Sequence, residues 1–189
     1  NEMYRMYYSW QDCGTNANLI TIMEGMQDPR LPLYMTMNQG DIKCEDGSTI
    51  AAGTRYLGIR PGHDIVSKPN EYVNYSYIVL DYTTPLPVMF AAESYFLRAE
   101  GALRGWNMGG AAKDFYEEGI RTSIKHQLAY KGSFAGISSI SDADIEAYVN
   151  NTATQEDLVD PVNSKFNYKA MNNVGTKWNE SGSNEEKLQ

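Results

Sequence analysis

Residues 85–130 constrain the fold more than any other part of the chain, because two helical patterns follow one another across a glycine-containing turn. Pro87 can occupy the first turn of a helix, where its missing N–H is not needed. The apolar side chains that follow at helical spacing are Val88, Ala91, Ala92, Tyr95, Phe96, Ala99, Ala102 and Leu103. The run 107–110 ends this pattern, and a second helix is expected from Ala111 to His126. The sequence therefore predicts an antiparallel helical hairpin over residues 87–128.

Small residues on both predicted helices, such as Ala99 and Gly119, would let the two backbones approach closely. The hairpin has the length of a tetratricopeptide-like unit, which is roughly 34 residues. An array of such units needs about three stacked copies to bury its apolar faces. Only one clear unit is recognisable in this chain.

The stretches 31–85 and 130–189 are rich in turn-forming residues and show little helical periodicity. Three helices are expected besides the hairpin: one over 16–27, capped by Asn16 or Asn18 and ended by the DPRLP sequence, one over 142–150, begun by Ser141 and Asp144, and a short one over 155–159. Strands are expected over 33–35 and 77–82. A turn is expected at Asp46-Gly47 and a loop over 131–140. The sequence thus predicts a mainly α-helical single domain over residues 1–189, with long irregular loops and one small β-hairpin.

Charge excludes two classes of partner. The formal net charge is −8, and the 16 basic residues are scattered along the chain. Nucleic acids and anionic membrane surfaces both require clustered Lys and Arg, so neither is expected to bind. No apolar run approaches the roughly 20 residues of a membrane-spanning helix.

Four segments resemble the SusD/RagB-like family, the outer-membrane glycan-binding lipoproteins of the Bacteroidetes. They are DPRLPLY at 28–34, YLGIRPG at 56–62, PVMFAAESYFLRAEGALRGW at 87–106 and AAKDFYEEGIRTSI at 111–124. The segments keep the order of the family and spread over about half of the chain. The resemblance implies that these residues are the C-terminal part of a larger SusD-like protein, packed against tetratricopeptide-like helices that the chain lacks.

The resemblance also implies a function. Members of this family capture an oligosaccharide or polysaccharide at the cell surface without cleaving it, and deliver it to a SusC-like TonB-dependent transporter of the outer membrane. The implied membrane attachment is a lipid on an N-terminal cysteine outside this chain. A helical-repeat module that binds another protein, without a sugar ligand, is the alternative.

Catalytic motifs are absent from the sequence, and no enzyme activity, cofactor or metal is expected. There is no nucleophile elbow, phosphate-binding glycine loop, HExxH helix or Cys-x-x-Cys pair. The acidic run from Asp142 to Glu146 fits the first turn of a solvated helix. The group Asp41, Glu45 and Asp46 could attract a cation, but an exposed acidic turn explains it more simply.

The two cysteines, Cys13 and Cys44, leave two interpretations open. A bridge between them would suit an exported protein and would stabilise it by about 3–4 kcal/mol. Two unpaired thiols, one of them buried, are equally compatible with the sequence.

Sugar binding has a signature of its own, because flat C–H faces stack on aromatic rings while hydroxyl groups pair with amides, carboxylates and guanidinium groups. The chain holds 14 Tyr and 3 Trp against 5 Phe, so rings with a polar group dominate. The candidate ligand-binding residues are Tyr56, Arg60, His63 and Asp64 in one Gly/Pro-rich segment, together with Trp178. The alternative for each is an ordinary role in anchoring a loop to the core.

Overall fold

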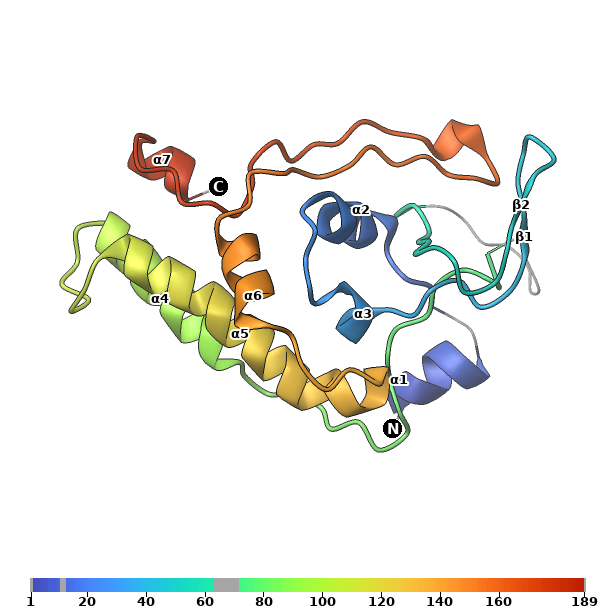
Figure 1. Ribbon diagram of the computed structural model, residues 1–189, viewed down its shortest axis with the longest axis horizontal. Helices are drawn as coiled ribbons and strands as arrows, with labels where there is room; N and C mark the ends of the chain where they lie inside the picture. Colours follow the sequence, from blue (N-terminus) through green and yellow to red (C-terminus); the bar gives the residue numbers. More distant parts are fainter. Residues whose placement is uncertain (1, 11–12, 63–71, 189) are drawn as a thin grey trace.

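A computed structural model of the chain describes residues 2–10, 13–62 and 72–188, and these parts are mainly helical, as the sequence predicts (Figure 1). The helices are α1 (Glu2–Tyr4), which continues as a π-helical turn (Arg5–Ser9), α2 (Ala17–Gly25), α3 (Leu31–Tyr34), α4 (Ala91–Leu103), α5 (Ala112–Ala135), α6 (Asp142–Val149), a 3₁₀ turn (Ser164–Phe166) and α7 (Asn184–Lys187). Strands β1 (Ile42–Lys43) and β2 (Thr49–Ile50) form one small antiparallel hairpin. No helix in the described ranges is long and apolar enough to cross a membrane.

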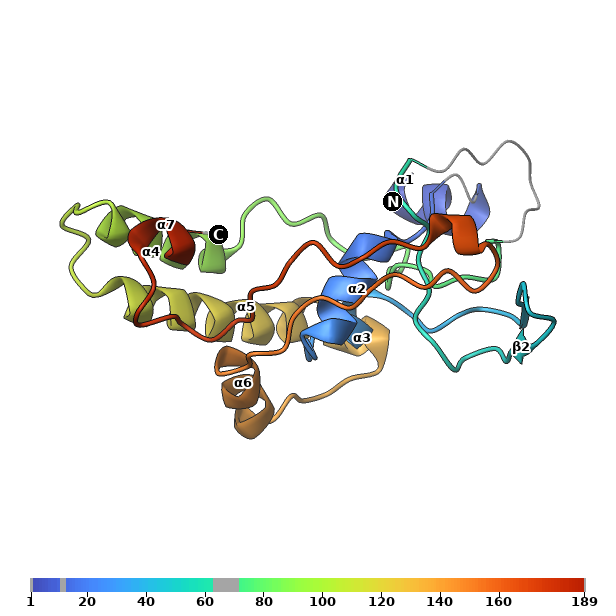
Figure 2. The same cartoon turned by 90° about the horizontal axis from the view of Figure 1, so that it is seen from above.

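The predicted helical hairpin is confirmed as α4 and α5, which lie side by side at one end of the molecule (Figures 1 and 2). Small residues permit the close packing. A Cβ atom on Gly119 would lie 2.7 Å from the ring of Phe96, so a larger residue could not occupy this position without displacing the ring.

The first helix starts later than predicted, at Ala91 instead of Pro87. Phe90 occupies the N-cap position of α4, and its backbone is extended. Its ring packs edge-on against His126 of α5 at a centroid distance of 5.0 Å. The side chain of Val88 is 99 % exposed, so it does not belong to the buried face of the helix that the sequence predicts. The extended backbone is favoured because it brings Phe90 onto α5.

The second helix ends later than predicted, at Ala135, so the loop expected over 131–140 is helical in its first half. The stop is Gly136, which adopts a positive φ of 70° that favours glycine. Its neighbour Ile137 donates its N–H to the carbonyl of Gly132 at 2.8 Å. This contact requires glycine at position 132, because a Cβ atom there would lie 2.5 Å from the Ile137 oxygen.

Both helices predicted from caps are confirmed. The Asn16 side chain accepts the N–H of Asn18 at 2.8 Å at the start of α2. The Ser141 hydroxyl accepts the N–H of Asp144 at 3.1 Å at the start of α6. The helix expected over 155–159 is wrong, because Leu158 instead exchanges two backbone hydrogen bonds with Tyr168.

The predicted strands are also wrong as strands. Residues 31–34 form α3, because Pro32 favours the first turn of a helix. The segment 77–82 is extended but contributes only an isolated bridge between Ile78 and Met35. The small β-hairpin lies instead around the predicted Asp46-Gly47 turn, where Gly47 has a φ of 86°.

A long excursion of the chain covers α2. After α6 the chain runs in extended form past α2 to the 3₁₀ turn near β1 and β2, and then returns to α7 beside α4 (Figure 1). The bridge between Leu158 and Tyr168 joins the outgoing and returning arms. Cys13 and Cys44 are both unpaired, as in the second interpretation, but each is only partly buried, so neither is the buried thiol that this interpretation expected.

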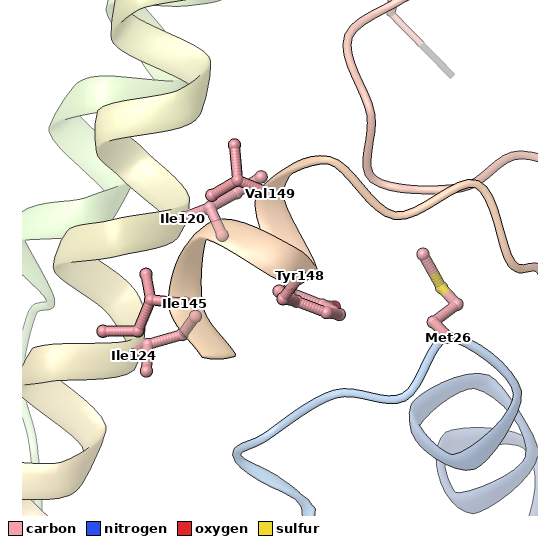
Figure 3. Close-up of a cluster of buried hydrophobic side chains, with 6 residues drawn as sticks. All are labelled: Met26, Ile120, Ile124, Ile145, Tyr148 and Val149. Carbon is pink, nitrogen blue, oxygen red and sulfur yellow. The ribbon is translucent and has the colours of Figure 1, made fainter. Parts of the chain in front are cut away.

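The helical hairpin and α2 meet through a buried apolar cluster of Met26, Ile120, Ile124, Ile145, Tyr148 and Val149 (Figure 3). In Figure 3, α6 turns Ile145 and Val149 toward α5, while Tyr148 lies on the side of Met26. Helix α6 thus fills the space between α5 and the end of α2.

A buried ion pair crosses the same junction. The guanidinium of Arg30 binds the carboxylate of Asp28 through two nitrogens, at 2.9 and 2.5 Å. The Tyr148 hydroxyl donates to Asp28 at 2.9 Å, and a third nitrogen of Arg30 donates to Ser123 of α5 at 2.6 Å. Burial raises the pKa of Tyr148, and the charge of Asp28 raises it further, so the hydroxyl keeps the proton that it donates.

Replacing Asp28 by Ala is expected to lower the free energy of unfolding by about 3 kcal/mol, because Arg30 would keep its charge without its partner. Urea unfolding followed by circular dichroism measures this. Glu180→Ala is the matched control, since that carboxylate pairs with Lys113 at an exposed position and little change is expected. Equal losses in the two variants would contradict the central role of the buried pair.

Candidate ligand-binding groove

The structure separates the predicted ligand-binding residues. Tyr56 lines a groove between α2 and the segments 55–58 and 156–161. Trp178 lies in a different pocket, which has no lining residue in common with the groove. His63 and Asp64 lie outside the described residues.

Backbone pairing beside α2 fixes one wall of the groove. Ala17, the first residue of α2, donates its N–H to the carbonyl of Ile59 at 3.0 Å, and Ile59 donates to Thr15 at 2.8 Å. Gly58 makes this approach possible, because a Cβ atom on it would lie 2.6 Å from the nitrogen of Ala17. The segment that carries Tyr56 is therefore held directly against the start of the helix.

Three buried polar residues hold the backbone on both sides of Tyr56. The Thr15 hydroxyl donates to Ser76 at 2.9 Å, and the Ser76 hydroxyl accepts the N–H of Leu57 at 2.8 Å. On the other side, the side-chain amide oxygen of Asn38 accepts the N–H of Arg55 at 3.0 Å. Buried polar groups that are fully paired make a backbone rigid. The Tyr56 side chain is partly buried and packs against the apolar cluster of Ile20, Met23, Leu31 and Met35, so its position is fixed from both the backbone and the core.

The opposite wall comes from the segment that the sequence predicts as a short helix. Glu156 donates its N–H to the carbonyl of Thr21 at 3.1 Å, and the Gln155 amide donates to the Thr21 hydroxyl at 3.0 Å. A Cβ atom on Gly25 would lie 2.5 Å from the nitrogen of Glu156, so this glycine lets the segment lie on α2.

The groove between these walls has a volume of about 140 Å³ and combines a tyrosine ring with charged groups of both signs. Its polar side chains include Glu24, Arg55, Tyr56, Glu156 and Asp157. Burial raises the pKa of Glu24, the charge of Glu156 raises it further, and Arg55 opposes both effects. Burial also raises the pKa of Tyr56, with a smaller contribution from Glu24. Glu24 and Tyr56 therefore influence one another electrostatically.

This set of side chains can bind a molecule that has both hydroxyl groups and an apolar face. Carboxylates accept hydrogen bonds, a guanidinium donates them, and the tyrosine can do both while offering a ring face. Asp157 is already engaged, because Lys169 binds its carboxylate at 2.6 Å. Glu24, Arg55 and Glu156 are the polar groups available beside Tyr56.

The sequence reasoning missed Glu24, Arg55 and Glu156 as site residues. Arg55 stands next to Tyr56 at the start of the segment that was singled out, so adjacency could have included it. Glu24 and Glu156 are 132 positions apart in the chain and meet only because the excursion returns over α2. No local pattern marks such a pair.

Arg60 does not line the groove. Its guanidinium carbon lies 5.9 Å from the centroid of the Tyr168 ring, a cation–π contact that holds the returning arm of the excursion. This position supports an anchoring role for Arg60.

Trp178 lines a pocket of about 210 Å³ beside α7. Its ring lies 5.6 Å from that of Tyr116 in α5, and the ammonium of Lys187 lies 5.5 Å from its centroid. The Tyr116 hydroxyl donates to the carbonyl of Thr176 at 2.7 Å. These contacts fasten the C-terminal segment to α5, and ligand binding by Trp178 stays a prediction.

The acidic turn that could have attracted a cation is used within the fold. Asp41, Glu45 and Asp46 accept backbone N–H groups of Ala52, Ser164 and Ser48 at 2.9, 2.7 and 2.9 Å, respectively. Among the residues that the structure describes, no group of three or more His, Cys, Asp or Glu could hold a metal ion.

Comparisons with known proteins agree with the fold. The family model described as "Susd and RagB outer membrane lipoprotein" matches residues 1–189. The chain therefore belongs to the SusD-like family. No protein of curated function matches the sequence.

Solved structures show the same relationship. A susD homologue from Bacteroides thetaiotaomicron is 32 % identical over 100 % of this chain and 35 % of its own, with a TM-score of 0.79. A chitin-binding SusD homologue from Flavobacterium johnsoniae is 34 % identical over 100 % of this chain and 34 % of its own, with a TM-score of 0.75. The chain thus has a SusD-like, mainly helical fold and spans about a third of the length of these proteins. Its place at the C-terminal end of such a protein stays a prediction.

The raised pKa of Glu24 predicts a pH-dependent cost to stability. A carboxyl group whose pKa is higher in the folded state destabilises the protein when it ionises. The free energy of unfolding therefore falls as the pH rises from the pKa of the unfolded state, about 4.3, through the pKa of the folded state. Glu24→Gln is therefore expected to raise the urea midpoint at pH 7, and this gain should disappear below about pH 4. The exposed Glu118 provides the control, and a Glu118→Gln variant with the same pH-dependent gain would contradict the prediction.

Proposed function

We propose that the groove beside Tyr56 binds a sugar unit of a glycan without cleaving it. The observation that carries this proposal is the position of Tyr56 on a rigid backbone beside Glu24, Arg55 and Glu156. Aromatic rings stack on the C–H faces of sugars, and the charged groups satisfy the hydroxyls. The chitin-binding relative supports a carbohydrate as the ligand class.

The acidic side chains of α6, one candidate pair of carboxyl groups for catalysis, have structural roles. Hydrolysis of a glycoside requires two carboxyl groups on opposite sides of the bond. Asp144 caps its own helix through Ser141, and Glu146 is paired with Arg121 of α5. These acids serve the helix start and the junction with α5.

The same proposal includes the setting of the full protein. The family is described as outer membrane lipoproteins, which supports a lipid-anchored protein at the cell surface. We propose that the captured glycan passes from there to a SusC-like TonB-dependent transporter. Delivery to a transporter requires release of the intact glycan, which a site built only for binding allows.

A protein-binding module is the second candidate, and the surface of the hairpin favours it. Large apolar side chains on and around α4 are exposed, namely Val88, Met89, Leu97 and Trp106. Exposed apolar patches mark surfaces that contact other protein. This surface is compatible with glycan capture as well, because it lies on a different part of the chain from the groove.

Affinity electrophoresis of the full-length protein tests the proposal. Gels that contain soluble chitin derivatives, starch or xylan should retard the protein, and product analysis should find no released sugar. Tyr56→Ala is expected to weaken retardation by roughly tenfold in apparent affinity, the equivalent of one well-packed aromatic contact.

Tyr82→Ala is the matched control, because this tyrosine is exposed and does not line the groove. Retardation that is equally weakened in both variants would contradict the assignment of the groove. Glycan hydrolysis by the full-length protein would overturn the proposal of a binding protein.

A further inference from the structure

A second hollow shares one lining residue, Tyr56, with the groove. The hollow has a volume of about 320 Å³. Besides Tyr56, its lining includes Tyr8, Pro32, Met37 and Phe134. The groove offers carboxylates and a guanidinium, whereas the second hollow has no charged side chain among the described residues that line it and offers rings, apolar side chains and the polar groups of Thr36 and the backbone.

One wall of the second hollow is fixed by the π-helical turn near the N-terminus. The Tyr8 hydroxyl donates to the carbonyl of Ile78 at 2.6 Å, and its ring packs edge-on against Tyr77 at 5.3 Å. On the other side, Tyr4 stacks on the Tyr8 ring at 4.8 Å. Tyr8 is therefore held in place by contacts outside the hollow.

The facing wall exists because α5 continues past its predicted end. Phe134 belongs to the last turn of α5, and the buried ammonium of Lys131 donates to the carbonyl of Val79 at 2.8 Å. Burial lowers the pKa of Lys131. This hydrogen bond ties the end of α5 to Val79. The preceding residue, Ile78, is the one whose carbonyl accepts the Tyr8 hydroxyl.

The two most accessible side chains of the hollow are apolar. Met37 is 41 % exposed and Phe134 is 36 % exposed. Apolar groups at the mouth of a hollow can cover the C–H face of a ligand. Because Tyr56 belongs to both hollows, a ligand that contacts its ring in the groove can continue into the second hollow.

We propose that the second hollow is an additional subsite, so that a linear oligosaccharide lies across Tyr56 with successive sugar units in the two hollows. This inference rests on the proposed function of the groove and adds a minimum ligand length. A single sugar can fill only one of the hollows, whereas a chain of two or more units fills both. Affinity should therefore rise steeply with chain length.

Isothermal titration of the full-length protein tests this with two series of probes, N-acetylglucosamine with its dimer and tetramer, and glucose with maltose and maltotetraose. In the series that binds, the tetramer should bind at least about tenfold more tightly than the single sugar, because it gains a second set of ring contacts. Phe134→Ala should reduce this ratio several-fold. Tyr56→Ala should weaken every member of the series.

Trp106→Ala is the control, because Trp106 is 65 % exposed and lines neither hollow. Met37→Ala provides a second variant at a more exposed position if Phe134→Ala unfolds, as judged by circular dichroism. A length ratio that both folded variants leave unchanged would overturn the second subsite, while a loss on Tyr56→Ala would still support the groove. If no probe of either series and no polysaccharide on the gels binds, the proposed function itself fails.

Discussion

The ion pair between Asp28 and Arg30 is the interaction on which the arrangement of this protein depends. It lies between α2 and α3 in the chain and reaches Ser123 of α5 and Tyr148 of α6. The apolar cluster of Figure 3 packs at the same junction, so the polar and apolar contacts fix the hairpin relative to α2 together. A buried pair of this kind is specific in geometry, because each oxygen and nitrogen needs its partner.

The groove depends on this junction indirectly. Helix α2 supplies Glu24 and is the surface on which two irregular segments lie, one before the hairpin and one after it. Gly58 and Gly25 remove the side chains that would hold these segments away from the helix. One consequence is that the pKa of Glu24 is raised. Its carboxyl group is partly buried beside a second acid, Glu156, so the charged form does not stabilise the fold.

Local patterns predicted the elements whose cause is local. The caps of α2 and α6 and the turn at Asp46-Gly47 depend on a few neighbouring residues, and all three are confirmed. The predicted start of α4 was wrong because a contact with the other helix, Phe90 on His126, decides it. The predicted end of α5 was wrong although its cause is local, since Gly136 stops the helix and Ile137 donates back to Gly132. Of the predicted site residues, Tyr56 lines the groove and Trp178 lines a separate pocket, whereas Arg60 lies beside the ring of Tyr168.

The sequence by itself determined the helical hairpin and its family, because periodicity and motif order are properties of the chain itself. Only the tertiary structure decided which side chains surround Tyr56. Glu24 and Glu156 become neighbours when the excursion after α6 returns over α2, and Phe134 reaches the second hollow only because α5 extends to Ala135. Contacts between distant segments depend on the packing of the whole chain, and no spacing within one segment encodes them.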